Sequence, residues 1–361
     1  MNQEIQKINN LGQSIWLDSI SRGMIHSGKL SSMVSNGITG VTSNPSIFQK
    51  ALSSEESYDE DINTSISSGE NDLKKIFQKL SIKDISDACE ILMPTYEKTL
   101  GKDGFVSIEI DPKFANNTEL SIQEGIYLNK VINKPNVMIK VPGTEAGMPV
   151  IEHLISLGIN INVTLLFDRA MYAKAAKAYI RGLDKLYLTN PDHIKKVNSV
   201  ASFFISRIDT SVDKIIDKKF QGKVAISNAI LAYYDFNKLF SSEIFNKLKS
   251  KGANKQRLLW ASTSVKNPNY EKLLYIANLI GEQTVNTVPE NVYEEIISNN
   301  NTYKKSLSSS FEIHQKTISS ALTDDKLKSI TDNLLEDGIN LFEEAFDSLL
   351  SELGNKITKN L

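Results

Sequence analysis

A lysine stands inside an apolar run of this sequence. Lys140 lies within Val137–Val141, whose other members are valine, methionine and isoleucine. If the run is a strand, Lys140 and Met138 point to one face and their neighbours to the other. In general, burial lowers the pKa of a lysine and supplies the neutral amine that attacks a carbonyl carbon. One interpretation is therefore a Schiff-base nucleophile. The other is a structural ion pair with Glu109, and the residues alone leave both open.

Polar residues recur inside or just after seven apolar runs. Each has a structural explanation when taken alone: Asp18 can cap a helix, Asn44 precedes a turn-forming proline, and Thr164 favours strands. Arg207 and Lys266 are available to hold an anionic group, with surface solvation as the alternative. Because several of these residues lie within the runs, helix caps do not explain the whole set. The set comprises Asp18, Thr42 and Asn44, Glu109, Lys140, Asn162 and Thr164, Ser202 and Arg207, and Ser262 with Lys266.

The runs that carry these residues are predicted to be buried strands, because most are apolar throughout rather than alternating. Helical patterns separate them, among them one expected to begin at Asp209 as its N-cap and one over Tyr270–Ile280. Strand alternating with helix eight times predicts an α/β fold, a single (β/α)8 TIM barrel. A doubly wound open sheet is the alternative, which the lack of a Gly-x-Gly-x-x-Gly motif after any strand disfavours. The expected strands are Ser14–Leu17, Ile38–Thr42, Phe105–Ile110, Val137–Val141, Ile161–Phe167, Val200–Ile205, Leu258–Ser262 and Thr284–Val288.

The barrel interpretation also says where chemistry should collect. In barrel enzymes the active site lies at the carboxyl ends of the strands and in the loops that follow them. The whole chain, 1–361, is expected to form one barrel domain. Two stretches are longer than a barrel requires. Residues 46–100 are expected to form a serine-rich helical insertion after the second strand, and residues 290–361 a helical C-terminal extension. An apolar stripe in the extension, from Phe342 to Leu353, is expected to pack on the barrel and to end at Gly354; a partner interface is the alternative.

Composition argues against several classes of partner and site. The formal net charge is −2, so there is no bulk electrostatic case for binding nucleic acid or an anionic membrane. No run approaches the length of a membrane span. The single cysteine, Cys89, cannot form an internal disulfide and is expected to pack within a helix, which favours the cytoplasm. The four histidines show no metal-ligand spacing, so no metal is expected.

Several motifs resemble the transaldolase family of the class I aldolase superfamily. They occur in the family's order over about residues 10 to 290, and the insertion and extension resemble its longer bacterial subgroup. The motifs are IWLDSISR (Ile15–Arg22), GVTSNPSIF (Gly40–Phe48), VMIKVPGTEAG (Val137–Gly147), INVTLLF (Ile161–Phe167), VASFFISRID (Val200–Asp209) and WASTSVKNP (Trp260–Pro268).

The resemblance implies an activity without metal or organic cofactor. Transaldolases move a dihydroxyacetone unit from sedoheptulose 7-phosphate to glyceraldehyde 3-phosphate, in the non-oxidative pentose phosphate pathway. The products are erythrose 4-phosphate and fructose 6-phosphate. By resemblance, Lys140 forms the imine. Glu109 acts as acid and base through a water held partly by Thr164, and Asp18 takes the proton from the hydroxyl on carbon 4 of the donor.

The remaining candidates are expected to bind substrate. By resemblance, Asn44, Asn162 and Ser202 contact the dihydroxyacetone part, and Thr42 is a further substrate-binding candidate. Arg207, with Ser262 or Ser264 and Lys266, is expected to face the phosphate. Shorter family members have an arginine where Lys266 aligns, and a lysine supplies a point charge rather than a bidentate fork. The expected partners are phosphorylated sugars, with a homodimer as the candidate assembly.

Two alternative functions are kept. The first is a fructose 6-phosphate aldolase-type enzyme that releases free dihydroxyacetone. In that sister family a tyrosine takes over the role that Glu109 would have in a transaldolase, so Glu109 favours transfer. The second is a barrel without catalysis that serves as a scaffold. A buried amine between two carboxylates has no use in a scaffold, so Asp18, Glu109 and Lys140 together disfavour it.

Overall fold

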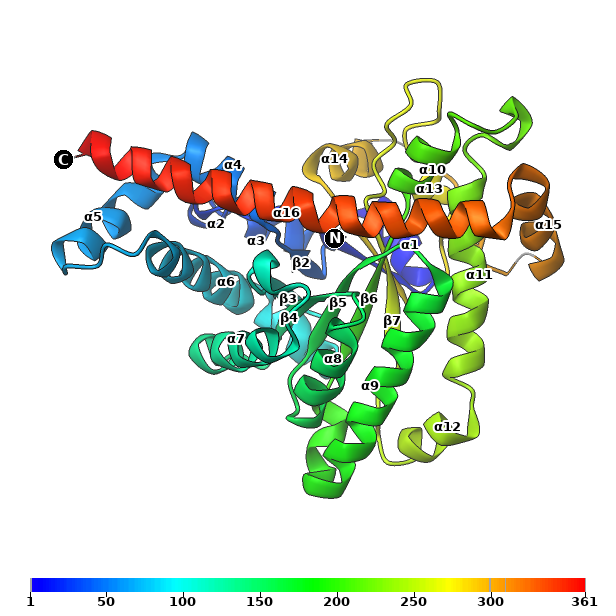
Figure 1. Ribbon diagram of the computed structural model, residues 1–361, viewed down its shortest axis with the longest axis horizontal. Coiled ribbons are helices and arrows are strands. Elements are labelled where there is room, and N and C mark those ends of the chain that lie inside the picture. The colour runs from blue at the N-terminus through cyan, green and yellow to red at the C-terminus, as the bar shows by residue number, and fades with distance from the viewer. Residues whose placement is uncertain (1, 299, 309, 361) are drawn as a thin grey trace.

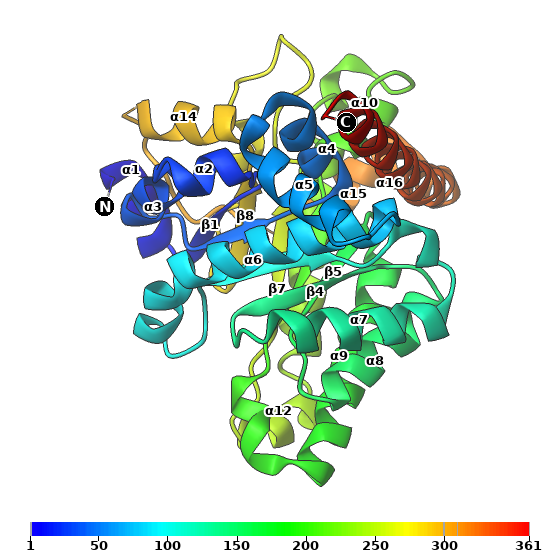
Figure 2. The same cartoon turned by 90° about the vertical axis from the view of Figure 1, so that its left-hand side faces the viewer.

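Eight parallel strands close into a barrel, in sequential order from β1 to β8, in the computed structural model of the chain. The structure describes residues 2–298, 300–308 and 310–360 (Figures 1 and 2). The predicted TIM barrel is confirmed, each expected strand overlaps an observed one, and the last matches in full. The strands are β1 Gln13–Leu17, β2 Gly40–Thr42, β3 Phe105–Glu109, β4 Val137–Pro142, β5 Ile161–Leu166, β6 Ser199–Phe204, β7 Gln256–Ala261 and β8 Thr284–Val288.

The strands are apolar on both faces because one face fills the barrel and the other meets the surrounding helices. Every residue of β4, β5 and β6 is buried. At the start of β2, the Trp16 ring lies so close to Gly40 that a Cβ atom there would meet it at 2.4 Å. The Trp16 indole donates a hydrogen bond of 2.8 Å to Asp103 Oδ1, which satisfies its only polar group. Gly40 is therefore required for β1 and β2 to pack together.

Helices surround the barrel and follow most of its strands. They are α1 Gln3–Asn10, α2 Arg22–His26, α3 Lys29–Ser35, α4 Pro45–Ser54, α5 Asp59–Ser67, α6 Leu73–Lys98, α7 Thr118–Ile132, α8 Gly147–Ser156, α9 Arg169–Thr189, α10 Ser206–Val212, α11 Val224–Leu239, α12 Glu243–Lys249, α13 Leu274–Asn278, α14 Glu290–Ser298, α15 Phe311–Ala321 and α16 Asp324–Asn360, with short 3-10 helices η1 Glu56–Tyr58, η2 Pro112–Phe114, η3 Pro191–Lys196 and η4 Lys218–Phe220.

Asp209 is not the N-cap of a helix through Lys219, so that expectation is wrong. It lies inside α10, where its carboxylate accepts hydrogen bonds from the Ala225 amide at 2.8 Å and from the Tyr275 hydroxyl at 3.0 Å. The carboxylate thus joins α10 to α11 and α13, contacts that no local pattern encodes. The helix expected over Tyr270–Ile280 is likewise shorter than predicted, since α13 begins only at Leu274.

Residues 46–100 form helices, as expected. One of these helices belongs to the wall of the barrel rather than to an added segment. The longest, α6, packs against β3 and α7 and so covers the barrel wall. Arg22 is buried and ties this region together through ion pairs of 2.9 Å to Asp84 of α6 and 2.7 Å to Asp61 of α5. Cys89 is buried in α6, which confirms that expectation, and burial raises the pKa of its thiol.

The C-terminal extension ends in one long helix, α16, which crosses the carboxyl end of the barrel (Figure 1). It contacts α4, α6, α10 and β5. Most of the apolar stripe is buried, with Phe342 6%, Phe346 5% and Leu349 0% exposed, while Ala345 and Leu350 are half-buried. Gly354 lies within α16, so the helix end expected there is wrong. Among the described residues, no helix is long and apolar enough to cross a membrane.

Candidate active site

A cavity of about 370 Å³ opens at the carboxyl end of the barrel. Most of the predicted site residues line it, although they come from widely separated parts of the chain. Glu109 and Asn162 are the exceptions; both are buried next to lining residues. The predicted residues that line the cavity are Asp18, Thr42, Asn44, Lys140, Thr164, Ser202, Arg207, Ser262, Ser264 and Lys266.

Lys140 and Glu109 are partners across adjacent strands. The register of β3 and β4 pairs the two residues, and Glu109 Oε2 lies 3.4 Å from Lys140 Nζ. The ammonium also donates a hydrogen bond of 3.1 Å to the carbonyl of Ser43. Both side chains are almost fully buried, at 6% and 4% exposed. The ion pair and the cavity-facing amine coexist, so the two interpretations of Lys140 are compatible.

Burial shapes the chemistry of Glu109. It raises the pKa of the carboxyl, the Lys140 ammonium works against that effect, and the charge of Asp18 adds to it. The other oxygen, Oε1, is buried without a hydrogen-bond partner among the described residues, and so is the Thr164 hydroxyl. A carboxyl with a raised pKa keeps its proton to higher pH than an exposed glutamate, which suits it to give and take protons in catalysis.

Asp18 follows β1 at the rim of the barrel interior. Its Oδ1 accepts a hydrogen bond of 2.7 Å from the Thr42 hydroxyl, which also lies 2.8 Å from the Thr287 hydroxyl. Asp18 is half-buried and lines the cavity. Thr42 therefore fixes the carboxylate from below and leaves its second oxygen available to a substrate.

A chain of hydrogen bonds orients the amide of Asn162. Ser202 Oγ donates to Asn162 Oδ1 at 2.7 Å, and Asn162 Nδ2 donates to Ser107 Oγ at 3.0 Å. Asn162 is itself in register with Lys140. Asn44 has a structural task as well, because its Oδ1 accepts from the Ile47 amide and caps α4, while the residue still lines the cavity.

Cations lie at the far side of the cavity. Arg207 is half-buried, and no carboxylate lies within ion-pair distance of it in the described part of the chain. Burial lowers the pKa of its guanidinium, which nearby Asp337 of α16 opposes. Lys266 is exposed and donates a hydrogen bond of 2.8 Å to Ser264 Oγ. The Ser262 hydroxyl lies 3.0 Å from that of Ser206, and its backbone has a φ of 55°, a strained conformation for serine.

Other residues of the cavity were not predicted. Phe204 at the end of β6 and Thr287 in β8 belong to predicted strands, so their positions at or near strand ends could have suggested them. Asn291 and Phe342 come from the C-terminal extension. Phe342 was predicted to be in a packing stripe, and only the path of α16 brings its ring into the site.

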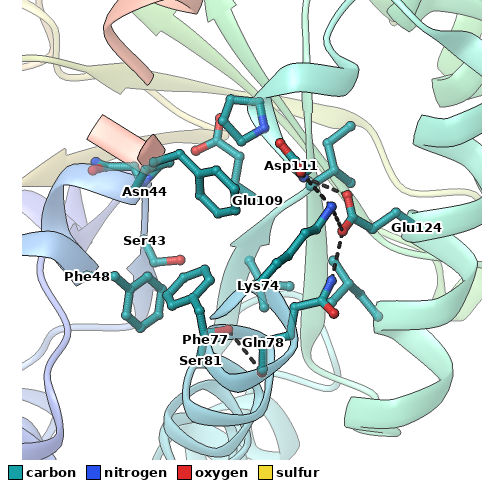
Figure 3. Close-up of a pocket in the computed structure, with 16 residues that line it drawn as sticks. Ser43, Asn44, Phe48, Lys74, Phe77, Gln78, Ser81, Glu109, Asp111 and Glu124 are labelled. Atoms are coloured by element: carbon teal, nitrogen blue, oxygen red, sulfur yellow. Dashed lines mark hydrogen bonds and ion pairs between the residues drawn. The ribbon is translucent and has the colours of Figure 1, made fainter. Parts of the chain in front are cut away.

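A second cavity, of about 40 Å³, is lined by residues from α4, α6, β3 and α16, among others (Figure 3). Phe48 and Phe77 line it together with a polar cluster. In this cluster Lys74 Nζ lies 2.5 Å from Asp111 Oδ2, and the Asp111 amide donates a hydrogen bond of 2.6 Å to Glu124. Glu109 also belongs to the lining, so one wall of this cavity adjoins the site. The volume is far too small for a sugar phosphate.

Comparisons with known proteins identify the family of this chain. The family model described as Transaldolase/Fructose-6-phosphate aldolase matches residues 15–353. A transaldolase of Trichodesmium erythraeum (strain IMS101) is 42% identical, over 98% of this chain and 97% of its own. Transaldolase 2 of Nostoc sp. (strain PCC 7120) is 41% identical over 97% of both chains. A transaldolase of Neisseria gonorrhoeae is 39% identical over 97% of this chain and 99% of its own. The chain belongs to the transaldolase/fructose-6-phosphate aldolase family.

Proposed function

We propose that this chain is a transaldolase that moves a dihydroxyacetone unit between sugar phosphates through a Schiff base on Lys140. The observation that carries the proposal is the buried amine at the base of the cavity, 3.4 Å from a carboxyl whose pKa burial raises. The relatives named transaldolase, similar over nearly their whole length, support the same activity. The donor is sedoheptulose 7-phosphate and the acceptor glyceraldehyde 3-phosphate, as in the non-oxidative pentose phosphate pathway.

Imine formation requires proton transfer at two points. Lys140 first passes a proton to Glu109, and the resulting amine attacks carbon 2 of the donor to form a carbinolamine. Loss of its hydroxyl as water needs a proton donor, and protonated Glu109 is the nearest such group. The unpaired Thr164 hydroxyl and Glu109 Oε1 are suited to hold the water through which this proton passes. The same groups, acting in reverse, hydrolyse the final imine.

Carbon–carbon cleavage uses the opposite wall of the cavity. Asp18 accepts the proton of the hydroxyl on carbon 4, the bond between carbons 3 and 4 breaks, and erythrose 4-phosphate leaves. The protonated imine accepts the electron pair and becomes an enamine. The enamine then attacks the aldehyde of glyceraldehyde 3-phosphate, and Asp18 returns its proton to the new hydroxyl. Hydrolysis releases fructose 6-phosphate.

Binding residues orient this exchange. Asn44 and Ser202 contact the dihydroxyacetone hydroxyls, and Asn162, buried beside the cavity, holds the Ser202 hydroxyl in place for that contact. Arg207 receives the phosphate, because its charge is half-buried and unpaired with any described carboxylate. Lys266, which is hydrogen-bonded to Ser264, adds a second cation for the phosphate. Thr42 positions Asp18 through its hydroxyl.

Borohydride trapping tests the proposal directly. The enzyme is incubated with fructose 6-phosphate, reduced, digested and examined by peptide mass spectrometry. A three-carbon adduct on Lys140 is the expected result. An adduct on another lysine, or no adduct at all, contradicts the mechanism. A scaffold without catalysis also predicts no adduct, so the same experiment separates it from the enzyme.

The sister activity, release of free dihydroxyacetone, needs a second measurement. Fructose 6-phosphate is supplied with and without erythrose 4-phosphate as acceptor. A transaldolase turns over at full rate only with the acceptor. Release of dihydroxyacetone at the same rate without it identifies a fructose 6-phosphate aldolase instead.

The single cysteine, Cys89, which cannot form an internal disulfide, supports a cytoplasmic enzyme, and a homodimer remains the candidate assembly.

A further inference from the structure

We infer that Phe342 of α16 decides whether the enamine is transferred to an acceptor or lost to water. This inference rests on the proposed Schiff-base mechanism and extends it to the C-terminal helix. It assigns to Phe342 a shielding role over the reacting carbon, in addition to its packing on the barrel.

The position of the ring carries the first part of the argument. Phe342 and Lys140 both line the cavity, and Lys140 Nζ lies 5.7 Å from the centroid of the Phe342 ring. Most of the side chains around the amine are polar, and the two aromatic ones are Phe204 and Phe342. A cation at this distance from a ring is attracted to its face, and an iminium ion formed on Lys140 is such a cation.

The helix that carries the ring is seated closely on the barrel. Gly338 lies one turn before Phe342, and a Cβ atom there would meet Leu165 Cδ2 at 2.9 Å and Arg207 Nη1 at 3.6 Å. Leu165 itself has a φ of 58° at the point where the register of β5 and β6 shifts. The close approach at Gly338 therefore sets the height of α16 above the site. Phe342 lies on the same face of the helix as Gly338 and lines the cavity, so this contact fixes where its ring stands.

The chemistry gives this position a consequence. After cleavage the enamine has two fates. In transfer, its carbon 3 bonds to the aldehyde carbon of the acceptor. In release, carbon 3 takes a proton, water adds to carbon 2 of the resulting iminium ion, and the carbon–nitrogen bond breaks to give dihydroxyacetone and the free amine. Both steps of release need water or a proton donor at the enamine, and an apolar ring above Lys140 keeps that volume dry.

The experiment measures the ratio of release to transfer. Release of dihydroxyacetone from fructose 6-phosphate is followed without an acceptor, and transfer is followed with erythrose 4-phosphate present. Phe342→Ala opens the space above Lys140 and is expected to raise the ratio by roughly tenfold. Phe342→Leu keeps the apolar bulk and is expected to raise it less. Leu349→Ala is the control, because Leu349 is fully buried on the same helix but lines neither cavity.

The outcomes separate the inference from a packing role. A ratio that rises in Phe342→Ala and stays at the wild-type value in Leu349→Ala supports it. A ratio unchanged in Phe342→Ala, or raised equally in both variants, overturns it. If Phe342→Ala does not fold, Phe342→Leu decides in the same way. Failure of the proposed function shows itself earlier, as the absence of transfer or of the Lys140 adduct in the wild-type enzyme.

Discussion

Glu109 and Lys140 face one another from adjacent strands, with the carboxylate Oε2 3.4 Å from the amine Nζ and both side chains buried. The register of β3 and β4 sets this pairing. A buried ion pair of this kind contributes little net stability, because the cost of removing two charges from water offsets their attraction. In the mechanism that we propose, each group is the proton-transfer partner that the other needs for imine chemistry.

Replacing Lys140 with methionine should abolish activity and leave the fold intact. Methionine has a similar length and no charge to bury. Because burial already raises the pKa of Glu109, that carboxyl can take a proton and become neutral once its partner is lost. We expect kcat to fall by roughly 10⁴-fold or more, as for other lost nucleophiles, with a melting temperature near that of the wild type.

The control for this variant is Lys174→Met. Lys174 is 52% exposed and forms a surface ion pair with Glu145. It should retain full turnover. A large drop in the melting temperature of Lys140→Met would show instead that the lysine is chiefly a structural partner of Glu109.

Glu109→Gln should slow imine formation without preventing it. Glutamine keeps the size of the side chain and cannot exchange a proton. The expected loss in kcat is about 10² to 10⁴-fold, the range associated with general acid–base catalysis. Borohydride trapping should still label Lys140, but more slowly. Glu119→Gln, at an exposed position of α7, should behave as the wild type. Equal labelling rates in Glu109→Gln and the wild type would remove Glu109 from the mechanism.

Arg207 and Lys266 should differ in their contribution to phosphate binding. Arg207 is half-buried, and loss of a charge-assisted hydrogen bond to phosphate costs about 1.5–3 kcal/mol, so Arg207→Ala should lower kcat/KM by roughly 10- to 100-fold. Lys266 is exposed, and an exposed charge contributes about 1 kcal/mol at most. Inhibition by inorganic phosphate gives an independent measurement, and should weaken clearly in Arg207→Ala. An equal effect of both substitutions would place the phosphate nearer to Lys266 than we propose.

Asp209 should make the stability of the protein depend on pH. Burial raises the pKa of this carboxyl to about 7, above an unfolded value of about 3.9. Between these values the folded state binds more protons than the unfolded state, so stability falls as pH rises through this window. The contribution is present below pH 4 and lost above pH 7, with a slope of up to about 1.4 kcal/mol per pH unit.

Asp209→Asn removes this titration. Its amide oxygen can still accept from the Ala225 amide, and its amide nitrogen can donate to the Tyr275 hydroxyl, which reverses that bond. Urea unfolding at several values between pH 4.5 and 7 should show a slope for the wild type that is steeper, toward lower stability at higher pH, than for the variant. Parallel curves for the two proteins would mean that Asp209 is not protonated in this window.

The barrel and the inward-facing part of the site could be predicted because both depend on local patterns. A strand buried on both faces must be apolar, so a polar residue inside such a run marks either the barrel interior or a strand end. For this reason the sequence marked Lys140, Asn162 and Ser202 as site candidates. Local pattern also predicted both ends of the strand Thr284–Val288. The family motifs then supplied the roles that residue types alone left open.

Contacts between distant elements could not be read in the same way. Asp209 looked like a helix cap because its local neighbours allow one, whereas its actual partners, Ala225 and Tyr275, lie on other helices. The spacing of apolar residues in α16 indicates that one face is buried, but not what that face covers. Periodicity specifies a direction around the helix axis, while the crossing over Lys140 depends on the fit of Gly338 against Leu165.

Local sequence was thus enough to identify the strands, the polar residues at their carboxyl ends and the lysine that we propose as the nucleophile, because burial on two faces and family motifs are encoded in adjacent residues. That Phe342 lines the site and that Asp209 is a buried link between helices could be seen only in the folded chain. Those outcomes depend on which surfaces meet after the barrel has closed.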